Sequence, residues 1–455
     1  MNKGLANAIY LIVERIRKEN VLGVLAELEE TQWYSTDHLL DLQWHKFKKL
    51  LRYAYDEIPF YTARFKEAGI EPEDIKTRED MQAIPVLTKP QIRENFDTIV
   101  SKCITRTEQL STSGSMAEPL MMIRCRDSMA YHRANMFRFR RWYDCGIGGF
   151  EATFRGTNFP FNMLLKLRVK DFLLNRKRVP ERNLSKENLD RYFREMLRAR
   201  PETFYGFPTL IEKFTSHLIE SGVPPKPFPT LKCVIPSSEM AYPWQKVKWR
   251  EYYGVPVAEE YGCTEAGILA IECPHGSWHI PVESCLIEYV TLDNPAIEQP
   301  PVKILITDLT NRALPIIRYD IGDSAVPGEG KCECGRGLPV MKGFAGRVSK
   351  LIDLPDGRTI HSLDFWYIFR KAGEIKPDGL REFQVKVVYP KEFIISIIPG
   401  KQFDDEIMGF LKYRIGFALG DKADITYKLV DDIAPTKSGK YDKIIIENNG
   451  RSTGV

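Results

Sequence analysis

The spacing of apolar residues predicts alternating helices and strands along the first 260 residues. Apolar positions recur every three to four residues in several stretches, with charged residues between them, which is the pattern of amphipathic helices. These predicted helices cover residues 5–28, 42–55, 65–69, 126–143, 184–198, 210–221 and 244–253. Short β-prone runs at 201–208, 231–235 and 252–257 are typical of buried strands. This alternation favours parallel strands joined by right-handed crossovers.

Prolines and hydroxyl residues set the expected limits of several helices. Pro59 is expected to break the helical pattern that precedes it. Thr88, within the extended segment 84–90, should cap the next helix, and Ser185 should cap the helix over 184–198.

The pattern changes to short strands after residue 267 and changes again near residue 346. Predicted strands cover residues 285–291, 302–307 and 316–319. After a hairpin turn at 353–358, the predicted order is helix 363–372, strands 383–389 and 393–399, helix 403–417 and strand 425–429. We therefore expect an α/β fold, with a large N-terminal domain of mixed sheets flanked by helices (residues 1–346). A small mobile α+β C-terminal domain (residues 347–455) should follow it.

Composition restricts the class of protein. The 455 residues are 43% apolar and 28% charged, and the net charge of +4 is too small to indicate nucleic-acid binding. No apolar run approaches the roughly 20 residues that span a bilayer, and the charged helix at 5–28 does not resemble a signal peptide. Nine cysteines, an odd number, indicate a reducing cytoplasm. The basic cluster at 166–182 is interpreted as a solvated helix face, with an anion-attracting or membrane-facing patch as the alternative.

Residues 259–267 carry the densest group of ligand-binding residue types. They follow a predicted strand, and ligands of open α/β sheets bind beyond the carboxyl ends of strands. Tyr261 can stack on a purine, Gly262 allows close approach of the backbone, Thr264 can bond a phosphate, and Glu265 can hold Mg²⁺. The alternative is an ordinary turn capped by polar residues.

A second candidate is the hydroxyl-rich loop at 111–115, with the sequence Ser-Thr-Ser-Gly-Ser. Backbone N–H groups and hydroxyls around a glycine can form a concave nest for phosphate oxygens. The loop lacks the Lys-Ser/Thr pair of a Walker motif, and an ordinary polar loop is the alternative.

Three further positions carry charges at turns or strand ends. Asp323 ends a predicted strand and can bond ribose hydroxyls, and Arg347 can approach the same sugar or a phosphate. A surface ion pair is the alternative for both. Lys440 lies on a Ser-Gly turn near the carboxyl end, where a solvated lysine is the alternative.

The order of these motifs resembles that of the adenylate-forming superfamily of acyl-CoA synthetases, adenylation domains and luciferases. Segments 58–61, 84–89 and 236–239 are similar to its phenylacetate–CoA ligase-like branch, which includes members encoded with capsular polysaccharide biosynthesis proteins. The resemblance covers roughly residues 40–447. It implies a ligase that uses ATP and Mg²⁺ to activate a small carboxylic acid as acyl-AMP and then transfers the acyl group.

The resemblance also implies roles for individual residues. ATP would contact Ser111, Thr112, Ser113, Gly114, Ser115, Glu260, Tyr261, Gly262, Asp323 and Arg347. The acid would lie against Tyr205, Gly206, Ser237, Ser238 and Glu239. Thr264 would touch the α-phosphate, Glu265 would bind Mg²⁺, and Lys440 would bridge the carboxylate and the α-phosphate. Coenzyme A is the expected acceptor, with an amine, a sugar or a carrier protein as the alternatives, and a homodimer is allowed for.

Two departures from the family pattern leave a degenerate, non-catalytic adenylate-binding protein as another alternative. The phosphate loop continues as Ser115-Met-Ala-Glu118-Pro, which lacks the family's second glycine and places an acid near the polyphosphate. Ser349 stands where the family has its hinge carboxylate. These changes bear on pyrophosphate handling and on domain movement.

A separate group has the residue types of a zinc site. Cys273, His275 and His279 precede Cys332 and Cys334, and three thiols with one imidazole suit tetrahedral Zn²⁺. Either histidine can be the fourth ligand, and some phenylacetate–CoA ligase-like proteins have a similar structural zinc. The alternative is a set of unrelated reduced residues.

Overall fold

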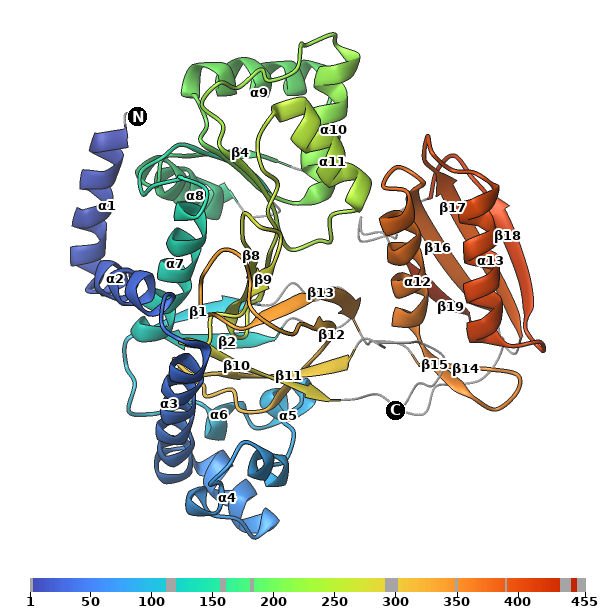
Figure 1. Cartoon of the computed structure of the whole chain (residues 1–455). Coiled ribbons are helices and arrows are strands. Elements are labelled where there is room, and N and C mark those ends of the chain that lie inside the picture. Colours follow the sequence, from blue (N-terminus) through green and yellow to red (C-terminus); the bar gives the residue numbers. More distant parts are fainter. Residues whose placement is uncertain are drawn as a thin grey trace.

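The computed structural model describes residues 3–111, 120–155, 161–180, 184–290, 302–347, 351–388, 391–433 and 443–447. It has the predicted α/β fold: mixed sheets flanked by helices form the larger part of the molecule, and a small α+β unit follows at the carboxyl end (Figure 1). None of the helices in these ranges is long and apolar enough to cross a membrane. All nine cysteines are free thiols.

The amino-terminal region consists of helices joined by short turns. They are α1 (Lys3–Arg17), α2 (Val21–Thr31), α3 (Thr36–Glu57), α4 (Pro59–Ala68), η1 (Pro72–Asp74), η2 (Glu79–Ala83), α5 (Lys89–Glu94) and α6 (Phe96–Ile99). The prediction of one helix over 5–28 is wrong, because Lys18 takes a left-handed conformation (φ 51°) and separates α1 from α2. The predicted break near Pro59 is confirmed, because α3 ends at Glu57 and Pro59 is the first residue of a separate helix, α4. The capping box of Thr88 and Gln91 confirms the predicted cap of α5.

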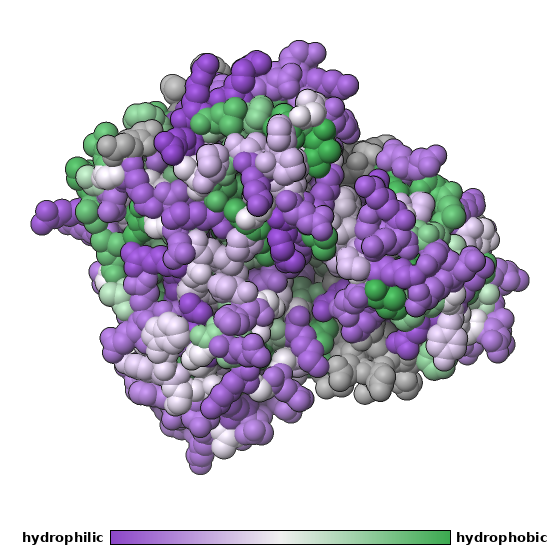
Figure 2. All heavy atoms as spheres, turned by 45° about the horizontal axis from the view of Figure 1, so that its top comes forward, coloured by the Kyte–Doolittle hydropathy of each residue, from purple (hydrophilic) through white to green (hydrophobic). Residues whose placement is uncertain are grey.

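Part of the surface of α1 is apolar. Leu5, Ile12 and Ile16 are exposed there, and apolar side chains mark the left edge of the molecule in Figure 2. In the neighbouring basic cluster, Arg178 pairs at 2.6 Å with Asp171, which is buried, so this part of the cluster is not a solvated face.

Four strands form a parallel sheet in the order β4-β3-β5-β6, as the strand–helix alternation predicts. The strands are β3 (Glu151–Phe154), β4 (Arg176–Val179), β5 (Thr203–Gly206) and β6 (Cys233–Pro236). The helices around them are α7 (Arg126–Arg141), α8 (Phe161–Leu173), α9 (Lys186–Ala199), α10 (Pro208–Glu220) and α11 (Pro243–Tyr253). Phe204 of β5 packs edge-on against Phe214 of α10 and Tyr253 of α11, which fixes these helices on the sheet.

A larger antiparallel sheet has the order β10-β11-β12-β13-β9-β8-β7. Its strands are β7 (Glu260–Cys263), β8 (Gly267–Glu272), β9 (Trp278–His279), β10 (Cys285–Val290), β11 (Val302–Asp308), β12 (Tyr319–Pro327) and β13 (Val340–Arg347). The hairpin β1 (Thr107–Ser111) and β2 (Met121–Cys125) adds to the same core. The strand predicted at 316–319 is shifted, because Arg318 has a positive φ (50°) and β12 begins only after it.

An ion pair lies buried between α7 and the approach to β10. Arg138 Nη1 donates to Glu283 Oε1 at 2.7 Å, and both side chains are fully buried. The Thr31 hydroxyl also donates to this carboxylate, at 2.8 Å. Burial favours a raised pKa for Glu283, but the Arg138 charge and the hydrogen bonds outweigh burial and hold that pKa below its ordinary value.

The carboxyl-terminal unit has a core of its own around one mixed sheet, in the order β18-β17-β16-β19. Its elements are β14 (Leu351–Asp353), β15 (Thr359–His361), α12 (Ser362–Ile375), β16 (Leu380–Val388), β17 (Glu392–Pro399), α13 (Asp405–Leu419), β18 (Asp424–Leu429) and β19 (Ile444–Glu447). The unit docks on α11, where Trp244 Nε1 donates to the Arg381 carbonyl at 2.9 Å and Lys443 lies 5.2 Å from the Tyr242 ring centre. The position of the domain boundary, 346/347, remains a prediction.

Candidate active site

The segment at 259–267 forms a hairpin and not the simple loop that the sequence predicts. The run at 252–257 is not a strand: α11 ends at Tyr253, and Gly254 follows in a left-handed conformation. The chain then runs beside β6 through bridges at Val257 and Glu260, and continues as β7. A Cβ at Gly262 would overlap the Gly267 carbonyl oxygen, so this glycine is required by the tight pairing of β7 with β8.

Tyr261 and Asp323 meet on neighbouring parts of the antiparallel sheet. The Tyr261 hydroxyl donates to Asp323 Oδ2 at 2.5 Å, and its ring packs on Phe344 of β13. Asp323 lies opposite Arg347 in the pairing of β12 with β13. Burial and the nearby carboxylate raise the pKa of Tyr261 well above its ordinary value, so the phenol stays protonated and donates. The structure thus brings the predicted adenine and ribose residues together and adds Phe344, which the sequence motifs did not include.

Glu265 lies in the turn between β7 and β8, and its side chain is buried. The Tyr319 hydroxyl lies 3.4 Å from Glu265 Oε1, in position to donate a weak hydrogen bond. Thr264 is half-buried in the same turn. The carboxylate and the hydroxyl predicted to act on phosphate and Mg²⁺ are therefore held on one short turn.

A second polar group lies at the carboxyl ends of β5 and β6. The Tyr205 hydroxyl donates to Glu260 Oε1 at 3.1 Å, and the Ser237 hydroxyl approaches the same oxygen at 3.4 Å. Gly206 has a φ of 141°, and a Cβ there would overlap the Phe154 carbonyl. Glu260 therefore joins the predicted acid-pocket residues to the segment that carries Tyr261.

Glu239 has a different set of contacts. Its carboxylate accepts hydrogen bonds from the backbone N–H (3.2 Å) and the hydroxyl of Thr209, in the first turn of α10. A carboxylate at a helix amino terminus stabilises that helix. Glu239 thus has a helix-capping role in this structure, while its predicted contact with the acid remains untested.

Arg155 belongs to this polar group and was absent from the candidates chosen from the sequence. It directly follows β3, and its Nη2 atom donates to the Tyr205 hydroxyl at 2.7 Å and to the Ser238 hydroxyl at 3.2 Å. Its guanidinium also lies 4.6 Å from the centre of the Tyr205 ring. The signal that could have found it is a basic residue at the end of a short buried strand, Glu151–Phe154, which the periodicity did not reveal.

Several predicted residues fall outside this description. Thr112, Ser113, Gly114, Ser115 and Lys440 lie outside the described residues. Ser111 is the last residue of β1, and Arg347 is the last of β13.

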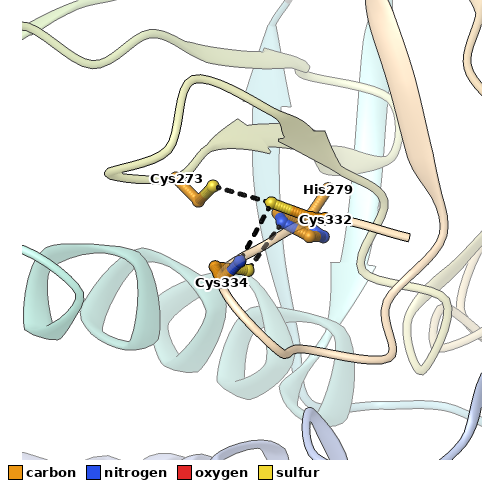
Figure 3. A group of neighbouring side chains, drawn as sticks. All are labelled: Cys273, His279, Cys332 and Cys334. Carbon is orange, nitrogen blue, oxygen red and sulfur yellow. Dashed lines mark hydrogen bonds between the residues drawn. The ribbon is translucent and has the colours of Figure 1, made fainter. Parts of the chain in front are cut away.

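The four candidate metal ligands form a compact group (Figure 3). The Sγ atoms of Cys273 and Cys332 are 3.6 Å apart, and Cys334 Sγ is 3.3 Å from His279 Nε2. His279 Nδ1 lies 3.0 Å from the Leu338 carbonyl, which accepts its proton and leaves Nε2 directed at the thiols. Burial lowers the pKa of His279 to about 4, so the ring is neutral at physiological pH.

His275, the alternative fourth ligand, lies elsewhere. Its side chain is half-exposed and faces Glu333 at 3.9 Å. The structure therefore places His279 in the cysteine group and leaves His275 outside it.

The chain is similar to known proteins over most of its length. The CapK C-terminal domain family matches residues 353–448. Protein CapK of Staphylococcus aureus is 20% identical over 415 residues and covers 88% of each chain. Phenylacetate-coenzyme A ligase of Thermus thermophilus is 24% identical over 430 residues, which are 88% of this chain and 94% of that protein. Over most of its length the chain is thus similar to adenylate-forming ligases of the phenylacetate–CoA ligase-like branch.

The fold of this chain also matches that of a solved structure. A crystal structure of 2-hydroxyisobutyryl-CoA ligase in the postadenylation state superposes with a TM-score of 0.65 at 19% identity, covering 89% of this chain and 88% of the other. The match supports the two-part fold seen in Figure 1, with a small carboxyl-terminal unit.

Proposed function

We propose that this ligase activates a small carboxylic acid with ATP, releases pyrophosphate, and passes the acyl group to coenzyme A in the cytoplasm. The observation that carries the proposal is the position of Glu260 and Tyr261. These adjacent residues contact the polar group at the ends of β5 and β6 on one side and Asp323 on the other. A nucleotide site and an acid site that share one strand can hold both reactants of an adenylation.

The nucleotide end of the site would use Tyr261 and Phe344 to pack against adenine, and Asp323 with Arg347 to bond the ribose. Asp323 is half-buried and accepts a hydrogen bond from Tyr261 on its Oδ2 atom, and a carboxylate can accept several hydrogen bonds at once. Ser111 to Ser115 would hold the phosphates through hydroxyls and backbone N–H groups.

The reaction joins a carboxylate oxygen to the α-phosphorus and breaks the bond from that phosphorus to the bridging oxygen, so pyrophosphate leaves with the electron pair. Negative charge collects on the α-phosphate oxygens in the transition state, where fixed donors act most strongly. Thr264 would donate to one of these oxygens, and Lys440 would bring a positive charge to the carboxylate and the α-phosphate. Glu265 would hold Mg²⁺, which would offset the charge of the phosphates when bound.

We also propose that Cys273, His279, Cys332 and Cys334 hold a structural Zn²⁺. Zinc bonds of 2.0–2.3 Å in a tetrahedron put the ligand atoms about 3.5–3.8 Å apart. The 3.6 Å between the Sγ atoms of Cys273 and Cys332 agrees with this spacing, and the 3.3 Å between Cys334 Sγ and His279 Nε2 is slightly shorter. The Leu338 carbonyl fixes the histidine tautomer, as second-shell acceptors do in zinc sites. The ion would tie the turn after β8 to the segment around Cys332.

The test of the proposed function is acid-dependent exchange of labelled pyrophosphate into ATP, with Mg²⁺, over a panel of aliphatic, aromatic and hydroxylated acids. Exchange with at least one acid, abolished by removing Mg²⁺ with a chelator, is the expected result. Tight ATP binding without exchange would support the degenerate, non-catalytic alternative.

A second measurement identifies the acceptor. Acids that support exchange are incubated with ATP and either coenzyme A, an amine, an amino sugar or a carrier protein, and the products are separated by mass. A thioester of coenzyme A is the expected product. An amide or a carrier-bound acyl group would move the function to the alternative acceptors while leaving the first half-reaction in place.

A further inference from the structure

A continuous chain of polar contacts links the ends of three parallel strands. Arg155 after β3 donates from Nη2 to the Tyr205 hydroxyl at 2.7 Å, and that hydroxyl donates to Glu260 Oε1 at 3.1 Å. Arg155 Nη2 also donates to the Ser238 hydroxyl, which follows β6. The carboxyl ends of parallel strands are where α/β sheets bind ligands, so this network of polar contacts occupies the expected position of the acid pocket.

Two atoms of this network of polar contacts are buried without a hydrogen-bond partner in the described part of the molecule. They are Arg155 Nε, a donor, and Glu260 Oε2, an acceptor. Arg140 and Glu151 nearby also hold such atoms, but these two side chains form an ion pair with each other. Arg155 and Glu260 form no such pair among the described contacts, and buried polar atoms in native proteins normally have a partner.

We propose that the unpartnered donor and acceptor recognise a hydroxyl group on the substrate, so that the acid activated by this ligase is a small hydroxy acid. The proposal rests on the proposed function. A hydroxyl can donate to Glu260 Oε2 and accept from Arg155 Nε with the same oxygen. Arg155 and Glu260 would be specificity residues that touch the substrate away from the reacting carboxylate.

The charges of the cluster exclude the other simple substituents. A second carboxylate would pair with Arg155 but would be repelled by Glu260. An ammonium group would pair with Glu260 but would be repelled by Arg155 and by the neighbouring Arg140. An alkyl or unsubstituted phenyl group would leave both buried atoms without a partner, and such sites reject analogues that lack the hydroxyl.

The experiment compares matched pairs of acids in the pyrophosphate-exchange assay. Each pair shares a carbon skeleton and differs in one hydroxyl, such as 3-hydroxybutyrate with butyrate and 4-hydroxyphenylacetate with phenylacetate. The expected result is a kcat/KM at least about 100-fold higher for the hydroxy acid in one or more pairs, since a hydroxyl-bonding site discriminates by up to about 10⁴–10⁵.

Two variants test the assignment of the residues. Glu260→Gln keeps the shape of the side chain but removes its charge, and Arg155→Met removes the donor while keeping an unbranched stem. Both should reduce the hydroxy/deoxy ratio at least about tenfold, mainly by lowering kcat/KM for the hydroxy acid. Arg191→Met is the matched control, because Arg191 is exposed on α9 and likewise lies over a tyrosine ring, that of Tyr192. It should leave the ratio unchanged.

The outcomes separate the two proposals. Equal or faster exchange with the deoxy acids would overturn the hydroxy-acid inference and leave the proposed adenylation standing. An unchanged ratio in folded Glu260→Gln protein would also overturn it, because that variant fills the same space. Absence of exchange with every acid would overturn the proposed function and this inference together.

Discussion

Removing the carboxylate of Asp323 is the most direct test of the nucleotide site. If Asp323 bonds the ribose hydroxyls, Asp323→Ala removes a hydrogen bond to a charged group, which is typically worth about 1.5–3 kcal/mol. The Kd for ATP should then rise about 10- to 150-fold. The side chain is half-buried on β12 and its loss opens no buried cavity, but the Tyr261 hydroxyl loses its acceptor, so the free energy of unfolding should fall by about 1–3 kcal/mol while the fold is retained.

The hydrogen bond from Tyr261 supplies the control. This hydroxyl donates to Asp323 at 2.5 Å. The rival explanation is therefore that Asp323 does not contact ATP and only orients the tyrosine ring. Tyr261→Phe keeps the ring and removes the hydroxyl, and its Kd for ATP should rise less than about tenfold if the carboxylate itself contacts the ribose.

Isothermal titration calorimetry of ATP with the three proteins measures these differences. An unchanged ATP affinity in Asp323→Ala would remove this residue from the site. An equal loss in Asp323→Ala and Tyr261→Phe would mean that the pair supports the ring and does not bond the sugar.

The remaining predictions concern zinc, catalysis and stability. Replacing Cys332 and Cys334 together with serine should release one equivalent of zinc by elemental analysis and lower the melting temperature, and wild-type protein without stoichiometric zinc would refute the metal site. Lys440→Ala should reduce pyrophosphate exchange about 10²–10³-fold with little change in ATP affinity. The control variant Lys437→Ala should leave the exchange rate unchanged. Arg138→Met should destabilise the fold by about 3–5 kcal/mol at pH 7, because Glu283 stays buried without its partner. The pKa of Glu283 is lower in the folded state than its ordinary value of about 4.3. Its contribution to stability is therefore present above about pH 4.3 and is lost as the pH falls through the folded-state pKa. The difference in melting temperature between wild type and Arg138→Met should narrow in acid.

The sequence predicted most of the element types because burial enforces them. The parallel strands β5 and β6 are short, apolar and flanked by amphipathic helices, and the cap at Thr88 needs only neighbouring side chains. Local chemistry of this kind is visible in a window of a few residues.

Other features depend on backbone conformation or on distant partners. Lys18 ends α1 with a positive φ, which lysine rarely adopts and which no residue pattern announces. The hairpin at 260–267 arises because β8 is available as an antiparallel partner, and a four-residue strand has too few positions for periodicity to reveal. Arg155 became a candidate only when folding placed Tyr205, fifty residues later, against it.

The order of motifs therefore predicted more of the site than any single motif did. Tyr261 and Asp323 lie 62 residues apart in the sequence and are joined by a hydrogen bond. Cys273 and Cys332 lie 59 residues apart and come together in the candidate metal site. The choice between His275 and His279 needed the structure, because two histidines four residues apart cannot be separated by ligand chemistry alone.

The docking of the small unit on α11 makes the fluorescence of Trp244 an intrinsic reporter of the position of that unit. The indole of Trp244 donates to the Arg381 carbonyl and lies 5.8 Å from the Arg381 guanidinium, while Lys246, on the same helix, binds Glu259 beside the hairpin at 2.9 Å. Any rotation of the small unit away from α11 must break the indole hydrogen bond, remove the cation and admit water. The emission of Trp244, isolated by subtracting the spectrum of Trp244→Phe, would therefore follow each rearrangement during turnover in real time, without an attached dye.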